Sequence, residues 1–131
     1  MDPQFILDND FDFEEQEALT GLINWQPLYN LYTTTDSIIV HIELPGVNLQ
    51  DVVIYLRSNY MLVVGNRKAP SELVRNCCIF HSLEIPYGRF SRRIDFPVPV
   101  EIRRYDYDIK DGILTMQFQA LTETIIPVEG D

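Results

Sequence analysis

Cysteine is scarce in this sequence of 131 residues, and the two that occur, Cys77 and Cys78, are neighbours. A disulfide between adjacent cysteines is strained and cross-links nothing, so a disulfide framework is excluded. Reduced thiols are typical of intracellular proteins. Residues 1–10 also lack the basic start and apolar stretch of a secretory signal peptide. We therefore expect a cytoplasmic protein.

Basic residues are few as well: ten Lys and Arg stand against twenty Asp and Glu, for a formal net charge of −10. Binding to nucleic acid requires a basic stripe that neutralises phosphates. The adjacent Arg92 and Arg93 lie in strand-like sequence and would point to opposite faces, so they form no patch. No apolar run approaches the length of a membrane span. Neither nucleic-acid binding nor a membrane span is expected.

Motifs of catalysis are also lacking: the chain has no glycine-rich phosphate loop, no Ser-His-Asp set and no dinucleotide fingerprint. Cys77, Cys78 and His81 offer three potential metal ligands within five positions. No fourth ligand is evident, because His41 belongs to a separate strand. Packing of small apolar side chains is the simpler interpretation of the cysteines. We expect no enzyme, no cofactor and no metal site.

What the sequence does contain is a strand pattern in a chain that is 46% hydrophobic. Residues 37–44 alternate apolar and polar, and Pro45-Gly46 ends that strand. Asp111-Gly112 predicts a tight turn between two further strands. Other strands are expected at residues 52–57, 61–65, 90–96, 102–110 and 114–120. The sequence predicts an all-β, immunoglobulin-like sandwich over residues 28–120.

The first 27 residues form an acidic N-terminal arm with a possible helix at residues 14–23. One interpretation is a solvated terminal arm without fixed structure. The other is an arm whose apolar side chains bind other protein chains. The candidates for that role are Phe5, Ile6, Leu7, Phe11, Phe13, Leu19 and Leu22.

Residues 69–86 form a connection between two strands that is longer than a hairpin requires, and they contain an apolar run at 77–80. Loops of this length in compact domains are usually functional or carry structure of their own. We expect the segment to offer a strand to another subunit. Arg92, on an apolar strand face, would require a partner, and we expect that partner across the interface.

The C-terminal extension, residues 121–131, contains the apolar tripeptide Ile126-Pro127-Val128. The side chains of Ile126 and Val128 point the same way from a stiff, extended backbone. Such a segment is suited to docking in a groove on its own domain or on a neighbour.

Several short motifs in their order along the chain resemble the small heat-shock proteins, the α-crystallin-domain family, in their bacterial, archaeal and plant type. The motifs are the Pro-Gly strand end at 43–47, the Gly-x-Arg strand end at 62–67, the Gly-x-Phe-x-Arg segment at 88–92, Phe96-Pro97, the Gly-Ile-Leu at 112–114 and the tripeptide at 126–128. The resemblance covers about residues 28–128.

The resemblance implies an ATP-independent holdase chaperone that binds unfolding client proteins and prevents their aggregation. It also implies a dimer in which a strand of the long loop swaps onto the partner, and a C-terminal anchor received by a groove on another dimer. By position, the dimer interface would comprise Cys78, Ile79, Phe80, His81, Leu83 and Arg92. The anchor would be Ile126, Pro127 and Val128, and the groove would be lined by Val52, Ile54, Leu56, Leu114, Met116 and Phe118.

The chain departs from this family pattern in two places. Tyr107 occupies a position where the family usually has a small residue. Only residues 121–125 separate the last strand from the anchor, and five extended residues span about 17 Å. We therefore expect a dimer, with larger assembly restricted by the short tether. The alternative is a monomeric co-chaperone-like adaptor without holdase activity.

Overall fold

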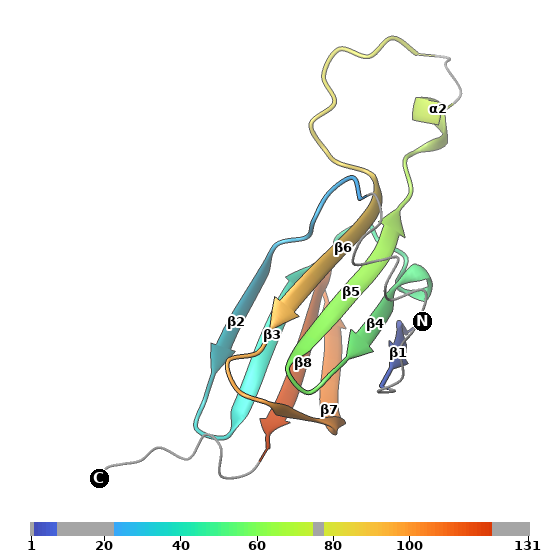
Figure 1. Ribbon diagram of the computed structural model, residues 1–131. Helices are drawn as coiled ribbons and strands as arrows, with labels where there is room; N and C mark the ends of the chain where they lie inside the picture. Colours follow the sequence, from blue (N-terminus) through green and yellow to red (C-terminus); the bar gives the residue numbers. More distant parts are fainter. Residues whose placement is uncertain (1, 8–22, 75–77, 122–131) are drawn as a thin grey trace.

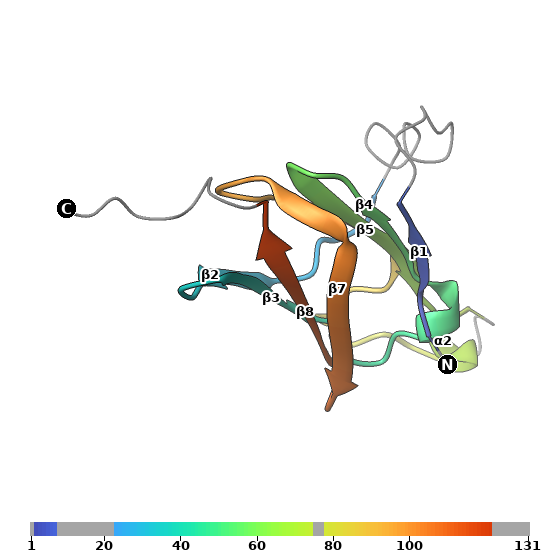
Figure 2. The same cartoon turned by 90° about the horizontal axis from the view of Figure 1, so that it is seen from below.

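The computed structural model describes residues 2–7, 23–74 and 78–121, and these form two β-sheets packed face to face (Figures 1 and 2). The first sheet has the order β1 (Gln4–Ile6), β4 (Val53–Leu56), β5 (Tyr60–Arg67) and β6 (Gly88–Asp95). The second sheet has the order β2 (Tyr29–Thr33), β3 (Ser37–Glu43), β8 (Ile113–Ala120) and β7 (Val100–Lys110). A 3-10 turn (η1, Leu49–Asp51) and a short helix (α2, Ser71–Val74) complete the described elements. The predicted all-β sandwich is confirmed.

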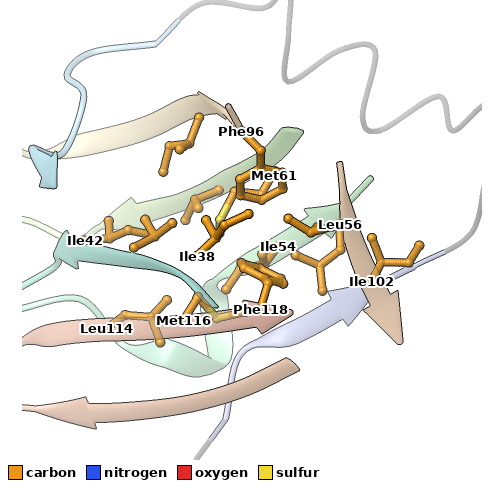
Figure 3. Close-up of a cluster of buried hydrophobic side chains, with 14 of the residues drawn as sticks. Ile38, Ile42, Ile54, Leu56, Met61, Phe96, Ile102, Leu114, Met116 and Phe118 are labelled. Carbon is orange, nitrogen blue, oxygen red and sulfur yellow. The ribbon is translucent and has the colours of Figure 1, made fainter. Parts of the chain in front are cut away.

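The core lies between the sheets because the apolar positions of each strand alternate inward. Ile38, Val40 and Ile42 of β3 are fully buried, and the paired strand β8 contributes Met116 and Phe118. Side chains from β4, β5 and β6 meet them from the opposite sheet (Figure 3). Burying one such side chain stabilises the fold by about 1.5–3 kcal/mol. Inward alternation in both sheets thus produces one continuous core.

The hairpin between β7 and β8 forms at the predicted turn. Asp111 and Gly112 both have positive φ angles, 54° and 80°. Two successive residues of this kind match the twist of antiparallel strands in a two-residue turn. A Cβ atom on Gly112 would also lie 3.0 Å from the Pro45 backbone. Glycine is therefore required by the close approach of the β3–β4 connection as well as by the turn.

The N-terminal arm contributes a strand that the sequence analysis did not predict. Residues 4–6 form β1, which pairs in parallel with β4, with Phe5 opposite Ile54. The helix expected at residues 14–23 lies, apart from Ile23, outside the described residues. Part of the arm is therefore an element of the sandwich.

The first sheet also has an apolar outer face. Tyr55 of β4 and Leu62 of β5 are each only 1% exposed, and they pack with Ile6, Val53, Tyr60 and Val64 rather than with the main core. Successive residues of β4 and β5 therefore bury side chains on both faces. No helix within the described residues is both long enough and apolar enough to cross a membrane.

Gly65 provides the space that Phe90 occupies, which gives a test of the core. A Cβ atom at position 65 would lie 2.6 Å from Cζ of Phe90, whose ring is held against Trp25 with 4.9 Å between centroids. We expect Gly65→Ala to lower the free energy of unfolding by about 1–3 kcal/mol through overpacking. Urea denaturation measures this loss. Adding Phe90→Leu should recover part of it, and an unchanged stability of the single variant would contradict the packing described.

Candidate functional site

The sandwich has two open sides, each bordered by one edge of each sheet. On the β2–β6 side, the guanidinium of Arg92 in β6 stacks 4.6 Å from the ring of Tyr29 in β2. On the β4–β7 side, β1 lies along β4 (Figure 2). The ring of Phe5 in β1 contacts the rings of Tyr105 and Tyr107 in β7. Edge strands expose unpaired backbone groups and are natural places for partner chains to bind. These two sides are the candidate interaction sites.

Residues 3–7 pack against β4 and β7 on the β4–β7 side. The ring of Phe5 lies 4.8 Å from that of Tyr105 and 4.9 Å from that of Tyr107, centroid to centroid. Phe5 and Leu7 both pack against the main core, and Pro3 is buried. The amide of Gln4 donates a 2.9 Å hydrogen bond to the Val52 carbonyl. We call this arrangement of residues 3–7 between β4 and β7 the β1 plug.

Polar contacts secure the outer end of the β1 plug. The hydroxyl of Tyr107 donates a hydrogen bond to the Asp2 carboxylate. This bond, together with partial desolvation of the ring and the Asp2 charge, raises the pKa of Tyr107 above its usual range. Burial raises the pKa of Tyr105 as well. Both effects favour the neutral phenols beside Phe5.

The six residues assigned by position to an anchor-receiving groove lie in the interior of the sandwich. Each is at most 1% exposed, and Figure 3 shows the side chains from β4 and β8 pointing into the space between the sheets. They are Val52, Ile54, Leu56, Leu114, Met116 and Phe118. The strand that faces β4 across the open side is β7, because β8 lies between β3 and β7.

Sequence reasoning missed the contact of Tyr105 and Tyr107 with Phe5. Tyr105 and Tyr107 alternate along β7 with Asp106 and Asp108, which are exposed. Alternation of aromatic and acidic residues in a strand indicates one apolar face. The sequence contains this alternation, but it does not show which strand lies opposite the apolar face.

The β2–β6 side carries exposed apolar side chains. The connection between α2 and β6 extends beyond the end of the sandwich (Figure 1), and in its described part the residues expected at the dimer interface are all exposed. These are Cys78, Ile79, Phe80, His81 and Leu83, with Ile79 83% exposed. Leu28 and Tyr32, next to and within edge strand β2, are 69% and 46% exposed.

Arg92 lies at the border of this surface and is half-buried rather than enclosed in the core. Besides stacking on Tyr29, it donates a 3.5 Å hydrogen bond to the carbonyl of Pro27. A cation over an aromatic ring is stabilised by the ring quadrupole. Arg92 thus connects β6 to the start of β2 within one chain.

Arg67 fixes the base of the long connection. As the last residue of β5, it donates hydrogen bonds of 3.0 and 2.6 Å to the Pro86 carbonyl, just before β6, and one of 3.0 Å to Pro45. Its guanidinium also lies 4.1 Å from the Trp25 ring and 5.6 Å from that of Tyr87. The two ends of the connection are therefore held together by one side chain.

Several predicted residues lie outside the described part of the chain. These are Phe11, Phe13, Leu19 and Leu22 of the arm and the anchor Ile126, Pro127 and Val128. Within residues 2–7, 23–74 and 78–121, no three His, Cys, Asp or Glu residues are grouped so as to hold a metal ion.

Apolar side chains exposed at the open edges of a β-sandwich are features of interaction sites. Residues 31–128 match the Hsp20/alpha crystallin family, and the chain belongs to this family. It is therefore a small heat-shock protein with an α-crystallin domain, in a family whose members are generally chaperones.

Two relatives illustrate the similarity in sequence. Small heat shock protein C4 of Rickettsia felis is 31% identical over 78 residues, which are 60% of this chain and 47% of the relative. Spore protein SP21 of Stigmatella aurantiaca is 29% identical over 90 residues, 69% of this chain and 52% of the relative. The chain thus spans about half the length of these relatives.

Solved structures share the fold. Heat shock protein 16.0 from Schizosaccharomyces pombe superposes with a TM-score of 0.67 at 21% identity, covering 82% of this chain and 97% of that one. A small heat-shock protein from Xylella fastidiosa gives a TM-score of 0.65 at 20% identity, with coverage of 82% and 96%.

The role of Arg67 can be tested by Arg67→Lys. A lysine cannot reproduce the forked hydrogen bonds or the stacking on Trp25, so we expect a loss of about 2 kcal/mol in the free energy of unfolding. Fluorescence of Trp25, the single tryptophan, should change in the folded state. The exposed Arg89→Lys is the matched control and should stay within about 0.5 kcal/mol of the original. Equal effects of both substitutions would contradict the role of Arg67.

The hydrogen bond of Tyr107 can be tested by titration. Because the pKa of Tyr107 is raised, the stabilisation is complete below pH 10 and is lost as the pH rises through the raised value. Asp2→Asn should lower the pKa of Tyr107, whereas Asp108→Asn should leave it nearly unchanged. Tyrosinate absorbance, taken as the difference from Tyr107→Phe, measures the pKa. The same pKa of Tyr107 in the original protein, Asp2→Asn and Asp108→Asn would contradict the hydrogen bond.

Proposed function

We propose that this protein is an ATP-independent holdase that binds unfolding proteins and keeps them from aggregating in the cytoplasm. Membership of the Hsp20/alpha crystallin family supports the proposal. The proposed activity needs no catalytic residue or nucleotide, only surfaces that bind apolar segments. Such surfaces have to be present on the folded domain.

The observation that carries the proposal is the group of exposed apolar side chains at the β2 edge and in the neighbouring connection. Large apolar residues exposed together mark interaction sites. The members are Leu28, Tyr32, Ile79, Phe80, Leu83 and Ile85, with exposures from 46% to 83%. Unfolding clients expose similar side chains and would bind through weak contacts repeated over several subunits.

The charge of the protein suits this role. A net charge of −10 makes complexes repel one another. Within the described residues, the exposed apolar side chains lie on β2, just before it and in the connection before β6, while acidic residues such as Asp106 and Asp108 are exposed on β7. Client-loaded complexes would therefore remain dispersed instead of joining through their apolar parts.

The same side supports a dimer. Strand β2 is an edge of its sheet, and residues 78–83 are exposed, belong to no helix or strand and precede β6 in the chain. We propose that this segment of one subunit pairs with β2 of a second copy, which covers Ile79, Phe80 and Leu83 until an unfolding client competes for them. Arg92, stacked on Tyr29, would then lie at the border of the interface.

Holdase activity is tested by heating an aggregating client with the full chain. We expect light scattering to be suppressed, because client segments bind the apolar group as they become exposed. Ile79→Ser combined with Leu83→Ser should raise the chain concentration needed for half-suppression several-fold. Glu84→Gln, exposed in the same connection but outside residues 78–83, is the matched control and should behave as the original. Client scattering unchanged by the full chain would overturn the assignment.

A monomeric adaptor is the second candidate function. The observation that favours it is the β1 plug, by which a single chain closes one of its own edges. Molar mass measured by light scattering during size-exclusion chromatography separates the two functions. We expect a dimer at micromolar concentration, and Ile79→Ser with Leu83→Ser should shift the mass towards the monomer. A monomer in the original protein would favour the adaptor.

A further inference from the structure

Two adjoining hollows lie where the long connection between β5 and β6 leaves the sandwich. The first has a volume of about 480 Å³. Its apolar walls come from Pro45, Pro70, Ile85 and Tyr87. The second has a volume of about 430 Å³ and adjoins the first, because Arg67, Lys68 and Tyr87 line both. We call the two hollows together the base pocket, and each has the size of a ligand site.

The base pocket is positively charged, although the protein as a whole is acidic. Arg67 and Lys68 line both hollows, and no aspartate or glutamate among the described residues lines either of them. The ammonium of Lys68 lies 3.8 Å from the Asp51 carboxylate, but both side chains are exposed. A pair of this kind contributes little and is readily exchanged for another partner. In a protein with a net charge of −10, the base pocket is thus a local site for an anionic group.

Arg67 retains hydrogen-bond donors for such a group. A guanidinium carries five N–H groups, and the hydrogen bonds of Arg67 within the described residues use one N–H on each of Nε, Nη1 and Nη2. One N–H on Nη1 and one on Nη2 therefore make no hydrogen bond in the described part of the chain, although the residue is only 9% exposed. Enclosed donors are costly when they lack an acceptor, and a carboxylate is the strongest acceptor for a guanidinium.

We propose that the base pocket is a client-binding subsite, and that it selects peptide segments in which an aspartate or glutamate lies close to an aliphatic residue. The aliphatic side chain packs against Ile85 and the two prolines. The carboxylate accepts hydrogen bonds from Arg67, with Lys68 beside it. The proposal rests on the proposed function, because it states which segments of an unfolding protein a holdase with this surface prefers.

Continuity with the exposed apolar group supports a client segment as the occupant. Ile85 is 63% exposed and belongs to that group, and it also forms a wall of the base pocket. It lies outside residues 78–83, so the proposed pairing of that segment with a second copy leaves Ile85 available. A segment that contacts Ile85 therefore reaches Arg67 within the same pocket.

Two opposing electrostatic effects act on an acidic segment that approaches the protein. The net charge of −10 repels it, but exposed charges beyond about 10 Å are largely screened at moderate salt. A charge-assisted hydrogen bond to Arg67 acts at contact distance in a partly enclosed site, where screening is much weaker. The local attraction therefore exceeds the general repulsion.

The test measures the binding of synthetic peptides to the full chain by isothermal titration calorimetry. The probe is Ser-Leu-Leu-Asp-Asp-Ser with blocked ends, and in the matched peptide asparagine replaces both aspartates. We expect the acidic peptide to bind about tenfold more tightly than the amide peptide, because only a carboxylate forms the charge-assisted hydrogen bond. It should also change the emission of Trp25, whose ring lies 4.1 Å from the Arg67 guanidinium.

Salt distinguishes the pocket from the general charge of the protein. The affinity for the acidic peptide should fall as salt is added, because attraction in the base pocket is being screened. Absence of binding, equal affinities for the two peptides, or an affinity for the acidic peptide that rises with salt would each overturn the proposal.

Substitution of Lys68 tests the location of the site. Its side chain is 74% exposed, so Lys68→Gln should preserve the fold, weaken the acidic peptide about threefold and leave the amide peptide unchanged. Arg103→Gln removes the same charge from an exposed position on β7 that lines neither hollow, and it should bind as the original does. Ile85→Ser should weaken both peptides. Equal losses in Lys68→Gln and Arg103→Gln would overturn the site.

Hexanoate, a free carboxylic acid with one aliphatic chain, tests the other source of the same chemistry. It should bind more weakly than the acidic peptide, which adds a second aliphatic side chain and backbone contacts. Tighter binding of hexanoate, with the same dependence on Lys68, would overturn the assignment to a peptide segment.

These measurements involve no aggregating client, so they separate failure of this proposal from failure of the holdase assignment. A preference for the acidic peptide that depends on Lys68 supports the base pocket even if client scattering proves unchanged by the protein. Suppressed scattering together with equal peptide affinities would retain the holdase assignment and overturn the selection of acidic segments.

Discussion

The covering of strand edges is the constraint on which the rest of this structure depends. Two packed sheets satisfy their backbone groups internally except at the outermost strands, which remain templates for pairing. On the β4–β7 side the chain supplies its own cover, because β1 pairs with β4 and inserts Phe5 between the sheets. On the β2–β6 side, no described strand pairs with the outer edge of β2. Within the described strands, the edge of β4 is thus covered by the chain itself, while the edge of β2 has no strand beside it.

This asymmetry relates the local interactions to the proposed activity. Arg67 joins the two ends of the long connection, so the exposed segment begins from a defined place beside the open edge. The carbonyls of Pro45 and Pro86 accept its hydrogen bonds, and Trp25 covers its guanidinium. A fixed base with exposed apolar side chains beyond it suits the proposed binding of apolar segments. The acidic charge keeps such a surface from promoting general association.

The sequence predicted most of the sandwich, because its signals are local. The alternation in β3 and the Asp111-Gly112 turn define strands and a hairpin without knowledge of the remainder. β1 could not be predicted in this way, since three residues in an acidic arm provide no periodicity, and their strand character comes from pairing with β4. The position of β7 opposite β4 could not be predicted from the sequence either, because it depends on the order of the strands in both sheets. The role of Tyr105 and Tyr107 can therefore be recognised only from their contacts with Phe5 in the structure.

Hydrogen exchange followed over a series of protein concentrations tests most directly whether one edge is closed within the chain and the other between chains. The account predicts that backbone amides of β4 facing β1 stay protected at every concentration, because their partner is attached to the same chain. Amides on the outer edge of β2 should be protected at high concentration and lose that protection on dilution, as the dimer dissociates. The account would be contradicted if the protection of β4 fell on dilution together with that of β2. It would also be contradicted if the protection of the β2 edge did not depend on protein concentration.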